Sequence, residues 1–183
     1  MADKKTPYAD LNPNVILNAI ESTGFNGADS LFALNSYENR VYQVGIQDAE
    51  PLIVKFYRPY RWSDEAIIEE HQFSSELASY EIPVVAPLAD DAEHTLHHYQ
   101  NFRFALFPRQ GARTIEFDNL EHLEWMGRFI ARIHAVGACK PFQHRLQLDA
   151  ESYGYKPYHF LIEQNFIPPE LLTNYCNTVE TVL

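Results

Sequence analysis

The sequence predicts an α+β fold, in which a five-stranded antiparallel sheet packs on one long helix and a helical region follows. Three observations predict it. Short runs rich in β-branched and aromatic residues succeed one another early in the chain, with connections short enough for antiparallel neighbours. One long amphipathic helical pattern interrupts these runs. Beyond Pro108, apolar residues recur at helical spacing as far as Leu183.

The first elements follow from local signals. A helix is expected from Asn12 or Asn14 to about Ser22, because Pro13 suits a first helical turn. Three strands should come next, over residues 30–34, 40–46 and 52–57.

Lys55 occupies an unusual place on the third expected strand. Side chains alternate between the faces of a strand, so Lys55 shares its face with the large apolar residues Ile53 and Tyr57. Such a lysine can extend its amine to solvent along its neighbours. Alternatively, it can meet a carboxylate on a packed helix.

The long helix supplies a candidate carboxylate. Ser63 suits the N-cap, and a core-facing stripe is expected from residues at helical spacing: Ala66, Phe73, Leu77 and Tyr80. Glu70 falls inside this stripe, where an unpaired carboxylate would cost several kcal/mol, so it is expected to pair with Lys55. Glu69 lies at the edge of the stripe and is expected to be solvated.

The second half of the chain begins with a hairpin. Strands are expected over residues 95–99 and 102–107, around Gln100-Asn101, and the run from Pro108 to Gly111 then breaks the pattern. A helix should start at Asp118, which has a glutamate at capping-box spacing. Further helices are expected near residues 158–166 and from Glu170 onward. The last of these reaches Leu183 without a stop signal, so the sequence is expected to end in mid-helix.

Composition narrows the class of partner and compartment. The chain has 183 residues and a formal net charge of −11, which argues against a nucleic-acid partner. Cys139 and Cys176 have neither metal-ligand spacing nor a disulfide framework, which suits a reducing compartment. No apolar run is long enough for a membrane span or a signal peptide, so we expect a cytoplasmic protein without a membrane partner. The histidines at 94, 97 and 98 are interpreted as hairpin residues rather than metal ligands.

Several segments together resemble the bacterial stress response kinase A family. The closest are LNSYENRVYQ at 34–43, VKFYRP at 54–59 followed by RW at 61–62, and EEHQF at 69–73. Later segments, FALFP at 104–108 and MGRFIARIH at 126–134, are typical of the broader aminoglycoside-phosphotransferase and choline-kinase branch of the protein-kinase-like fold.

The resemblance implies a fold, an activity and a set of site residues. It implies an ATP-binding small lobe over residues 1–107, a hinge or linker over 108–117 and an incomplete helical large lobe over 118–183. The family is a cytoplasmic, ATP- and Mg-dependent serine/threonine protein kinase linked to stress responses. In this sequence, Ser36 matches the loop residue at the ATP phosphates, Lys55 the phosphate-binding lysine and Glu70 its partner. Phe107 to Gln110, including Phe107 and Arg109 as binding residues, match the hinge that receives the adenine edge through backbone groups.

One part of the family pattern is missing. The catalytic His-Gly-Asp run and the later metal-binding aspartate do not occur in these residues and would lie beyond Leu183, so no catalytic or metal-binding residue is assigned. The chain is therefore expected to be inactive alone, because phosphoryl transfer needs a base and Mg ligands. Two alternatives stay open: a small-molecule kinase acting on an amino alcohol or sugar, and a non-catalytic nucleotide-binding or interaction module.

Overall fold

The computed structural model describes residues 7–25, 28–111 and 114–183, so Ala112 and Arg113 of the expected linker lie outside the described residues. The chain forms two compact units, Met1–His144 and Arg145–Leu183, and each is described by itself. These two units are defined by their internal contacts and do not test where a small lobe or a large lobe begins. The lobe boundaries expected from the sequence stay a prediction.

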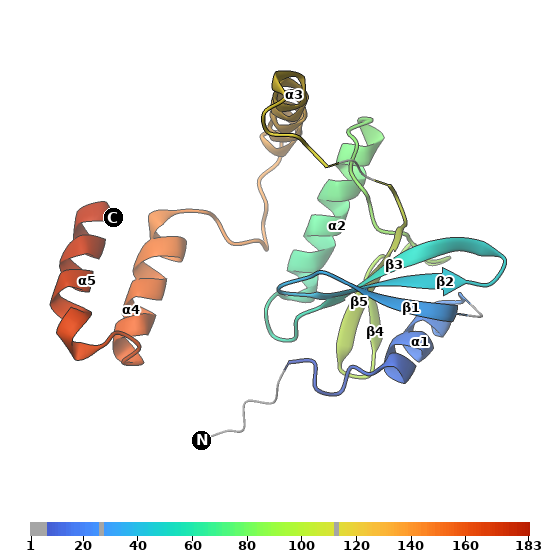
Figure 1. Ribbon diagram of the computed structural model, residues 1–183, viewed down its shortest axis with the longest axis horizontal. Coiled ribbons are helices and arrows are strands. Elements are labelled where there is room, and N and C mark those ends of the chain that lie inside the picture. Colours follow the sequence, from blue (N-terminus) through green and yellow to red (C-terminus); the bar gives the residue numbers. More distant parts are fainter. Residues whose placement is uncertain (1–6, 26–27, 112–113) are drawn as a thin grey trace. The chain divides into compact units, whose positions relative to one another are not determined.

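The first unit is built on a five-stranded sheet, as predicted (Figure 1). The strands lie in the order β1-β2-β3-β5-β4, and each pair of neighbours is antiparallel. Their bounds are β1 Ala28–Leu34, β2 Arg40–Ile46, β3 Ala49–Tyr57, β4 His97–Tyr99 and β5 Phe102–Pro108. Strand β4 is shorter than expected, because Thr95 lies outside the ladder and its hydroxyl bonds to His71 of α2. The β4–β5 turn places Gln100 at φ 52°.

Helix α1, Pro13–Glu21, covers one face of the sheet. The Asn12 side chain caps it by accepting a hydrogen bond from the Val15 amide at 3.1 Å, so the helix begins at the earlier of the two expected starts. The apolar side of α1 packs on the alternating residues of β2, β3 and β5. This main core consists of Val15, Ile16, Ala19, Ile20, Val44, Ile46, Leu52, Val54, Phe56, Phe102, Phe104 and Leu106.

Helix α2, Asp64–Ser79, lies over the opposite face of the sheet. Its N-cap is Ser63, as predicted, but its buried side differs from the predicted stripe. The buried residues are Ala66, Ile67, His71 and Leu77. Phe73 is only half-buried, and Tyr80 is 57 % exposed, because the helix ends at Ser79 and the chain turns away at Glu81, where φ is 56°.

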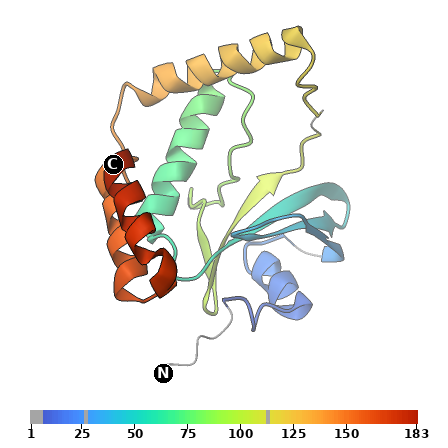
Figure 2. The same ribbon diagram turned by 60° about the vertical axis from the view of Figure 1, so that its left-hand side comes forward.

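Helix α3, Leu120–Gly137, crosses the C-terminal end of α2 (Figure 2). The predicted cap at Asp118 is wrong by one residue. Asn119 is the N-cap, and its Oδ1 accepts hydrogen bonds from the amides of Glu121 and His122 at 3.0 and 3.4 Å. Both residue types cap helices well, so backbone geometry decides between them.

The second unit contains the π-helical turn η1, Glu151–Tyr155, and helices α4, Lys156–Glu163, and α5, Pro169–Val182. The two predicted helices are therefore present, with shifted bounds. The Tyr158 and Tyr175 rings, 5.9 Å apart, join α4 to α5. Within the described residues, none of the helices combines the length and apolarity needed to cross a membrane.

Candidate functional site

The predicted pair of Lys55 and Glu70 is confirmed. Lys55 on β3 and Glu70 on α2 meet with 3.0 Å between Nζ and Oε1. Their side chains are 23 % and 32 % exposed. The pair is thus partly screened from water, unlike a lysine whose amine lies fully in solvent. It is still exposed enough to contact a ligand.

Tyr57 supports Lys55 from the same strand face. The Lys55 ammonium lies 4.6 Å from the centre of the Tyr57 ring, which is a cation–π distance. The Tyr57 hydroxyl is 2.6 Å from Nε2 of His71, the residue next to Glu70. Strand β3 and helix α2 are therefore joined by two adjacent polar contacts, one charged and one neutral.

His71 is a buried member of this cluster, with 2 % of its surface exposed. Its Nδ1 lies 2.8 Å from the Thr95 hydroxyl, so both ring nitrogens have partners. Each hydroxyl can donate or accept, which suits a neutral ring with one N–H. Burial lowers the pKa of His71 to about 4, so the ring is neutral at physiological pH.

A cleft of about 370 Å³ opens beside the Lys55–Glu70 pair. This volume lies within the range of about 300 to 1,000 Å³ typical of small-molecule sites. The lining residues come from β2, β3, α2, the extended segment after α2 and the end of β5. They are Val41, Ile53, Lys55, Glu70, His71, Ser74, Val85, Phe107, Pro108 and Gln110.

The cleft has an apolar part and a charged part. Ile53 lies opposite Phe107 in the β3–β5 ladder, and Val41 lies opposite Lys55 in the β2–β3 ladder. The apolar side chains of Val41, Ile53 and Phe107 therefore lie next to Lys55 along the strands. Sequence reasoning missed Val41 and Val85 as lining residues. The strand pairing that brings Val41 beside Lys55 could have indicated the first, whereas Val85 lies in a segment without regular structure.

Two of the predicted site residues do not line this cleft. Ser36 lies half-buried in the loop between β1 and β2. Arg109 follows β5, and its Nε donates a hydrogen bond to Gln43 Oε1 at 3.1 Å, so its side chain is directed to β2. Gln110, the last residue of the expected hinge run, lines the cleft. The roles of Ser36 and Arg109 in nucleotide binding stay predictions.

The loop that carries Ser36 is anchored at its end nearest β2. The Glu38 carboxylate accepts hydrogen bonds from Arg61 Nε at 3.3 Å and from Trp62 Nε1 at 3.2 Å. Asn39 Oδ1 accepts a further bond from the Arg58 amide at 3.2 Å. These bonds attach the loop to the segment that leads into α2.

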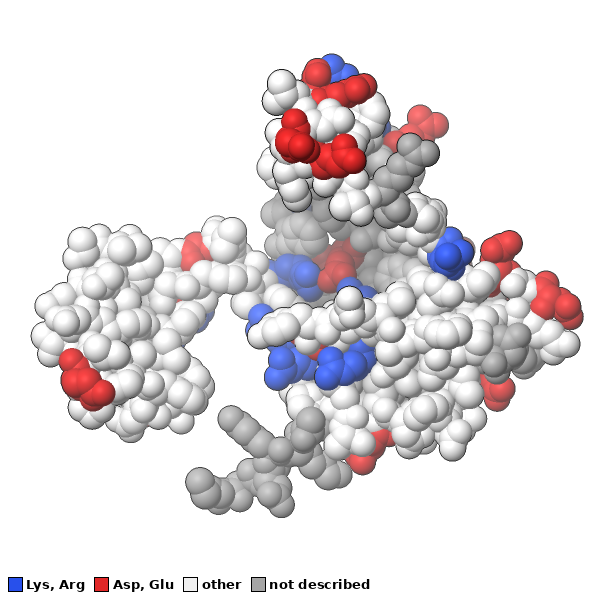
Figure 3. Space-filling view, viewed as in Figure 1, with Lys and Arg blue, Asp and Glu red and all other residues white. Residues whose placement is uncertain are grey.

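Basic side chains gather near this end of the sheet, although the chain is acidic overall. Arg40 lies opposite Phe56 in the ladder, and Lys55, Arg58 and Arg61 follow along β3 and just beyond it. Figure 3 shows several Lys and Arg side chains around the hollow in the middle of the view, with acidic atoms inside it. This distribution favours an anionic ligand.

The described residues do not form a metal site of their own. They contain no cluster of three or more His, Cys, Asp or Glu side chains arranged for a metal. The hairpin histidines lie near carboxylates instead. Nδ1 of His94 and of His97 lies 3.5 and 3.9 Å from Asp90 Oδ2, and His98 Nε2 lies 2.9 Å from Asp64 Oδ2. Mg²⁺ prefers several oxygen ligands, and the lining of the cleft, as described, offers one carboxylate, Glu70, already bonded to Lys55. The cleft therefore fits an anion better than a bare cation.

The expectation that Glu69 is solvated is wrong. Its carboxylate accepts hydrogen bonds from the amides of Gln143 and His144, at 2.5 and 2.9 Å. The partners lie more than 70 residues away along the chain, so helical periodicity could not reveal them.

These features define the class of protein. An antiparallel five-stranded sheet whose third strand carries a lysine paired with a glutamate of the next helix is the small lobe of a protein-kinase-like fold. Residues 32–158 match the phosphotransferase enzyme family, and the chain belongs to that family.

Within this family, the chain is similar to proteins named as stress response kinases. The chain is 38 % identical over 183 residues to stress response kinase A of Salmonella choleraesuis (strain SC-B67), covering all of this chain and 56 % of the relative. Identity and coverage are the same for the serine/threonine protein kinase RdoA of Salmonella typhimurium (strain LT2). The chain thus spans about half the length of the curated relatives it matches.

Solved structures support the fold. An amicoumacin kinase, hAmiN, in complex with AMP-PNP and Ca²⁺, matches with a TM-score of 0.69 and 15 % identity, over 93 % of this chain and 53 % of the kinase. A microcompartment-associated aminopropanol kinase matches with a TM-score of 0.60 and 18 % identity, over 75 % of this chain and 46 % of the kinase. At these identities the likeness concerns the fold alone.

Proposed function

We propose that this chain provides the nucleotide-binding part of an ATP-dependent serine/threonine protein kinase that acts in a cytoplasmic stress response. The observation that carries the proposal is the Lys55–Glu70 pair at 3.0 Å in the cleft wall. Lys55 binds the ATP phosphates, and Glu70 holds the lysine in place. Ser36 contributes a hydroxyl to the phosphates, and Phe107 and Arg109 receive the adenine edge through backbone groups.

The organisation of the proposed kinase follows the same reasoning. Residues 1–107 form its small lobe, 108–117 its linker and 118–183 the first part of its large lobe. ATP is used with Mg²⁺, which neutralises phosphate charge during transfer. The names of the relatives support a protein acceptor, while the length match of about half makes the activity of the whole protein part of the proposal.

A second candidate is a small-molecule kinase of the same fold. The structural neighbours named as amicoumacin and aminopropanol kinases favour it. The ATP cleft would be the same in both cases, because acceptor groups lie outside the Lys55–Glu70 site.

Calorimetric titration with ATP and Mg²⁺ tests the nucleotide site. Lys55→Ala should weaken ATP binding by about ten-fold or more, because a hydrogen bond to a charged group contributes about 1.5 to 3 kcal/mol. Lys156→Ala, on α4 of the second unit, is the matched control and should bind as the original chain does. Equal affinity of the Lys55→Ala variant and the original chain would overturn the proposal.

Transfer of phosphate from ATP labelled on its terminal phosphate tests which acceptor the kinase uses. The assay uses the protein purified at the length at which the cell produces it. Transfer of label to serine or threonine of a protein supports the protein kinase. Transfer to an amino alcohol, with none to protein, supports the second candidate instead. The 183-residue chain alone is expected to transfer no label, because it lacks the base and the Mg ligands. Absence of transfer by a protein that also carries the His-Gly-Asp run would contradict both candidates.

A further inference from the structure

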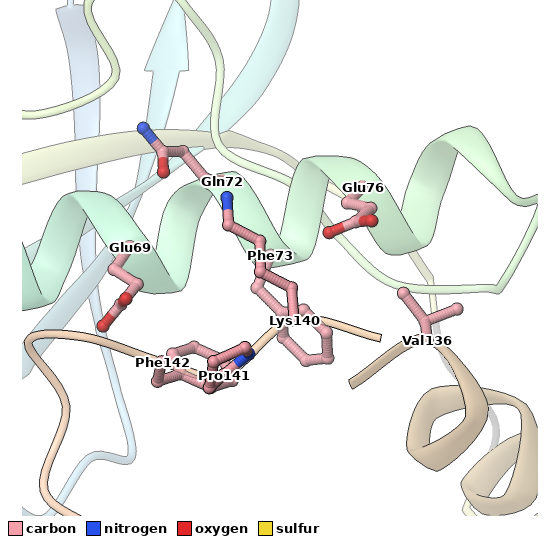
Figure 4. Close-up of a pocket in the computed structure, with 8 residues that line it drawn as sticks. All are labelled: Glu69, Gln72, Phe73, Glu76, Val136, Lys140, Pro141 and Phe142. Carbon is pink, nitrogen blue, oxygen red and sulfur yellow. The ribbon is translucent and has the colours of Figure 1, made fainter. Parts of the chain in front are cut away.

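The side of α2 that faces away from the sheet is held by residues 137–144, here called the strap. Figure 4 shows Glu69 and Phe73 projecting from α2 toward the part of the strap that carries Lys140, Pro141 and Phe142. The Glu69 carboxylate accepts the hydrogen bonds of two successive strap amides, those of Gln143 and His144. A carboxylate that accepts two backbone N–H groups fixes both partners.

An aromatic contact lies next to this carboxylate. The rings of Phe73 and Phe142 meet edge to face, with centres 5.2 Å apart and planes at 73°. Gly137 starts the strap against the same ring, since a Cβ there would lie 3.5 Å from Phe73 Cζ. The strap therefore contacts α2 over a full helical turn, from Glu69 to Phe73.

Helix α3 adds a contact at the end of α2. Arg132 donates a hydrogen bond to the Tyr80 carbonyl oxygen at 2.7 Å. Together with the strap, this bond fastens α2 at its middle and at its C-terminal end.

The hollow between α2 and the strap is too small for a substrate. Its volume is about 50 Å³, and a single water occupies about 30 Å³ in the liquid. The arrangement is therefore better explained as a contact that positions α2 than as a second ligand site.

We propose that the strap positions α2 for nucleotide binding, with Glu69 and Phe142 as positioning residues for the Lys55–Glu70 pair; this inference rests on the proposed ATP site. Glu69 and Glu70 are successive residues of one helix, so they move together. The Lys55–Glu70 bond at 3.0 Å is lost if α2 shifts by about 1 Å, because hydrogen bonds weaken beyond about 3.5 Å. Fixing Glu69 on the outer side therefore fixes Glu70 on the inner side.

ATP titration of two variants of the 183-residue chain tests the strap. Glu69→Ala and Phe142→Ala should each weaken ATP binding by about three- to ten-fold, the range expected for residues that act through others. Glu69→Gln keeps one carbonyl acceptor and should recover part of the affinity. Glu76→Ala is the control, since Glu76 lines the same hollow and its carboxylate has no hydrogen bond to the strap among the described residues. It should bind ATP as the original chain does.

A double substitution separates positioning from general destabilisation. In a Glu70→Ala background, Glu69→Ala should have no further effect on ATP affinity, because the bond it positions is already absent. A further loss equal to that of the single variant overturns the inference. So does unchanged ATP affinity of Glu69→Ala when Lys55→Ala binds weakly.

Amide hydrogen exchange gives a reading that does not depend on ATP. If the original chain binds no ATP, the proposed function fails, while the strap can still be judged from exchange across residues 64–79. Faster exchange there in Glu69→Ala than in Glu76→Ala supports the strap, and equal exchange contradicts it.

Discussion

Helix α2 has two sides that are held in different ways. The side toward the sheet is buried. Its buried residues are Ala66, Ile67, His71 and Leu77. The side toward the strap has half-buried residues, of which Glu69 and Phe73 make the main contacts. Burial holds the first side, whereas a few directed contacts hold the second.

This difference separates stability from position. Burying a large aliphatic side chain stabilises a fold by about 1.5 to 3 kcal/mol, so the sheet side keeps α2 folded. Edge-to-face rings contribute only about 0.5 to 1.5 kcal/mol beyond their burial. Changes on the strap side should therefore displace α2 without unfolding the chain.

The largest effect is expected on the sheet side. Ile67→Ala should lower the free energy of unfolding by about 3 kcal/mol, because it leaves a cavity in a fully buried position. Urea unfolding of the chain measures this. The neighbouring Ile68, 39 % exposed, provides the matched control, and Ile68→Ala should cost less than about 1 kcal/mol. Equal losses in the two variants would contradict the division between the sides.

The second effect is a pH dependence that originates on the sheet side. The pKa of His71 is lowered by burial from 6.5 to about 4, so the unfolded chain binds more protons between these values. The neutral ring's contribution to stability is complete above pH 6.5 and declines as the pH falls toward 4, by about 3 kcal/mol in total.

Unfolding measured at several pH values tests this dependence. His71→Gln should be less stable at pH 7 and should lose less stability than the original chain between pH 6.5 and 4. Leu148→Ala, which changes an 81 % exposed residue without a titratable group, should keep the original slope. A slope for His71→Gln equal to that of the original chain would show that the buried ring does not titrate as described.

A smaller effect is expected on the strap side. Phe142→Ala should lower the free energy of unfolding by about 1 kcal/mol, because it removes the edge-to-face contact of a half-exposed ring. Leu148→Ala, at an 81 % exposed position, is the control and should leave unfolding in urea unchanged. A loss for Phe142→Ala as large as that for Ile67→Ala would show that the strap is part of the core.

The smallest effect is expected at the end of α2. Arg132→Ala removes the exposed bond to the Tyr80 carbonyl and should reduce stability by about 0.5 kcal/mol. Arg128→Ala removes only an exposed pair with Glu124 and should have no measurable effect on thermal unfolding. If Arg128→Ala is the more harmful of the two, the contact with Tyr80 does not hold the helix.

Much of the sheet and the central pair could be predicted because both depend on short-range patterns. Strand alternation placed Lys55 on the face opposite Leu52 and Phe56, and helical spacing turned Glu70 toward it. The ends of two helices were predicted wrongly. Tyr80 fitted the helical period but lies beyond the last turn, and Asn119 caps α3 in place of its neighbour.

The strap could not be predicted from the same patterns. Glu69 has its partners on a segment that is distant in sequence and lacks regular structure, and Val85 reaches the cleft from another such segment. Contacts of this kind depend on how the elements pack. Periodicity describes only which way each element faces.

The anchoring of Glu38 has a consequence for how relatives can vary in length. Its bonds to Arg61 and Trp62 fix the loop after Tyr37, while β1 fixes it before Asn35. Tyr37 itself is 99 % exposed, so inserted residues can be accommodated at that tip without disturbing either anchor. An insertion between Glu38 and Arg40 would instead separate the Glu38 anchor from the start of β2 and disturb the bond that Asn39 Oδ1 accepts from the Arg58 amide.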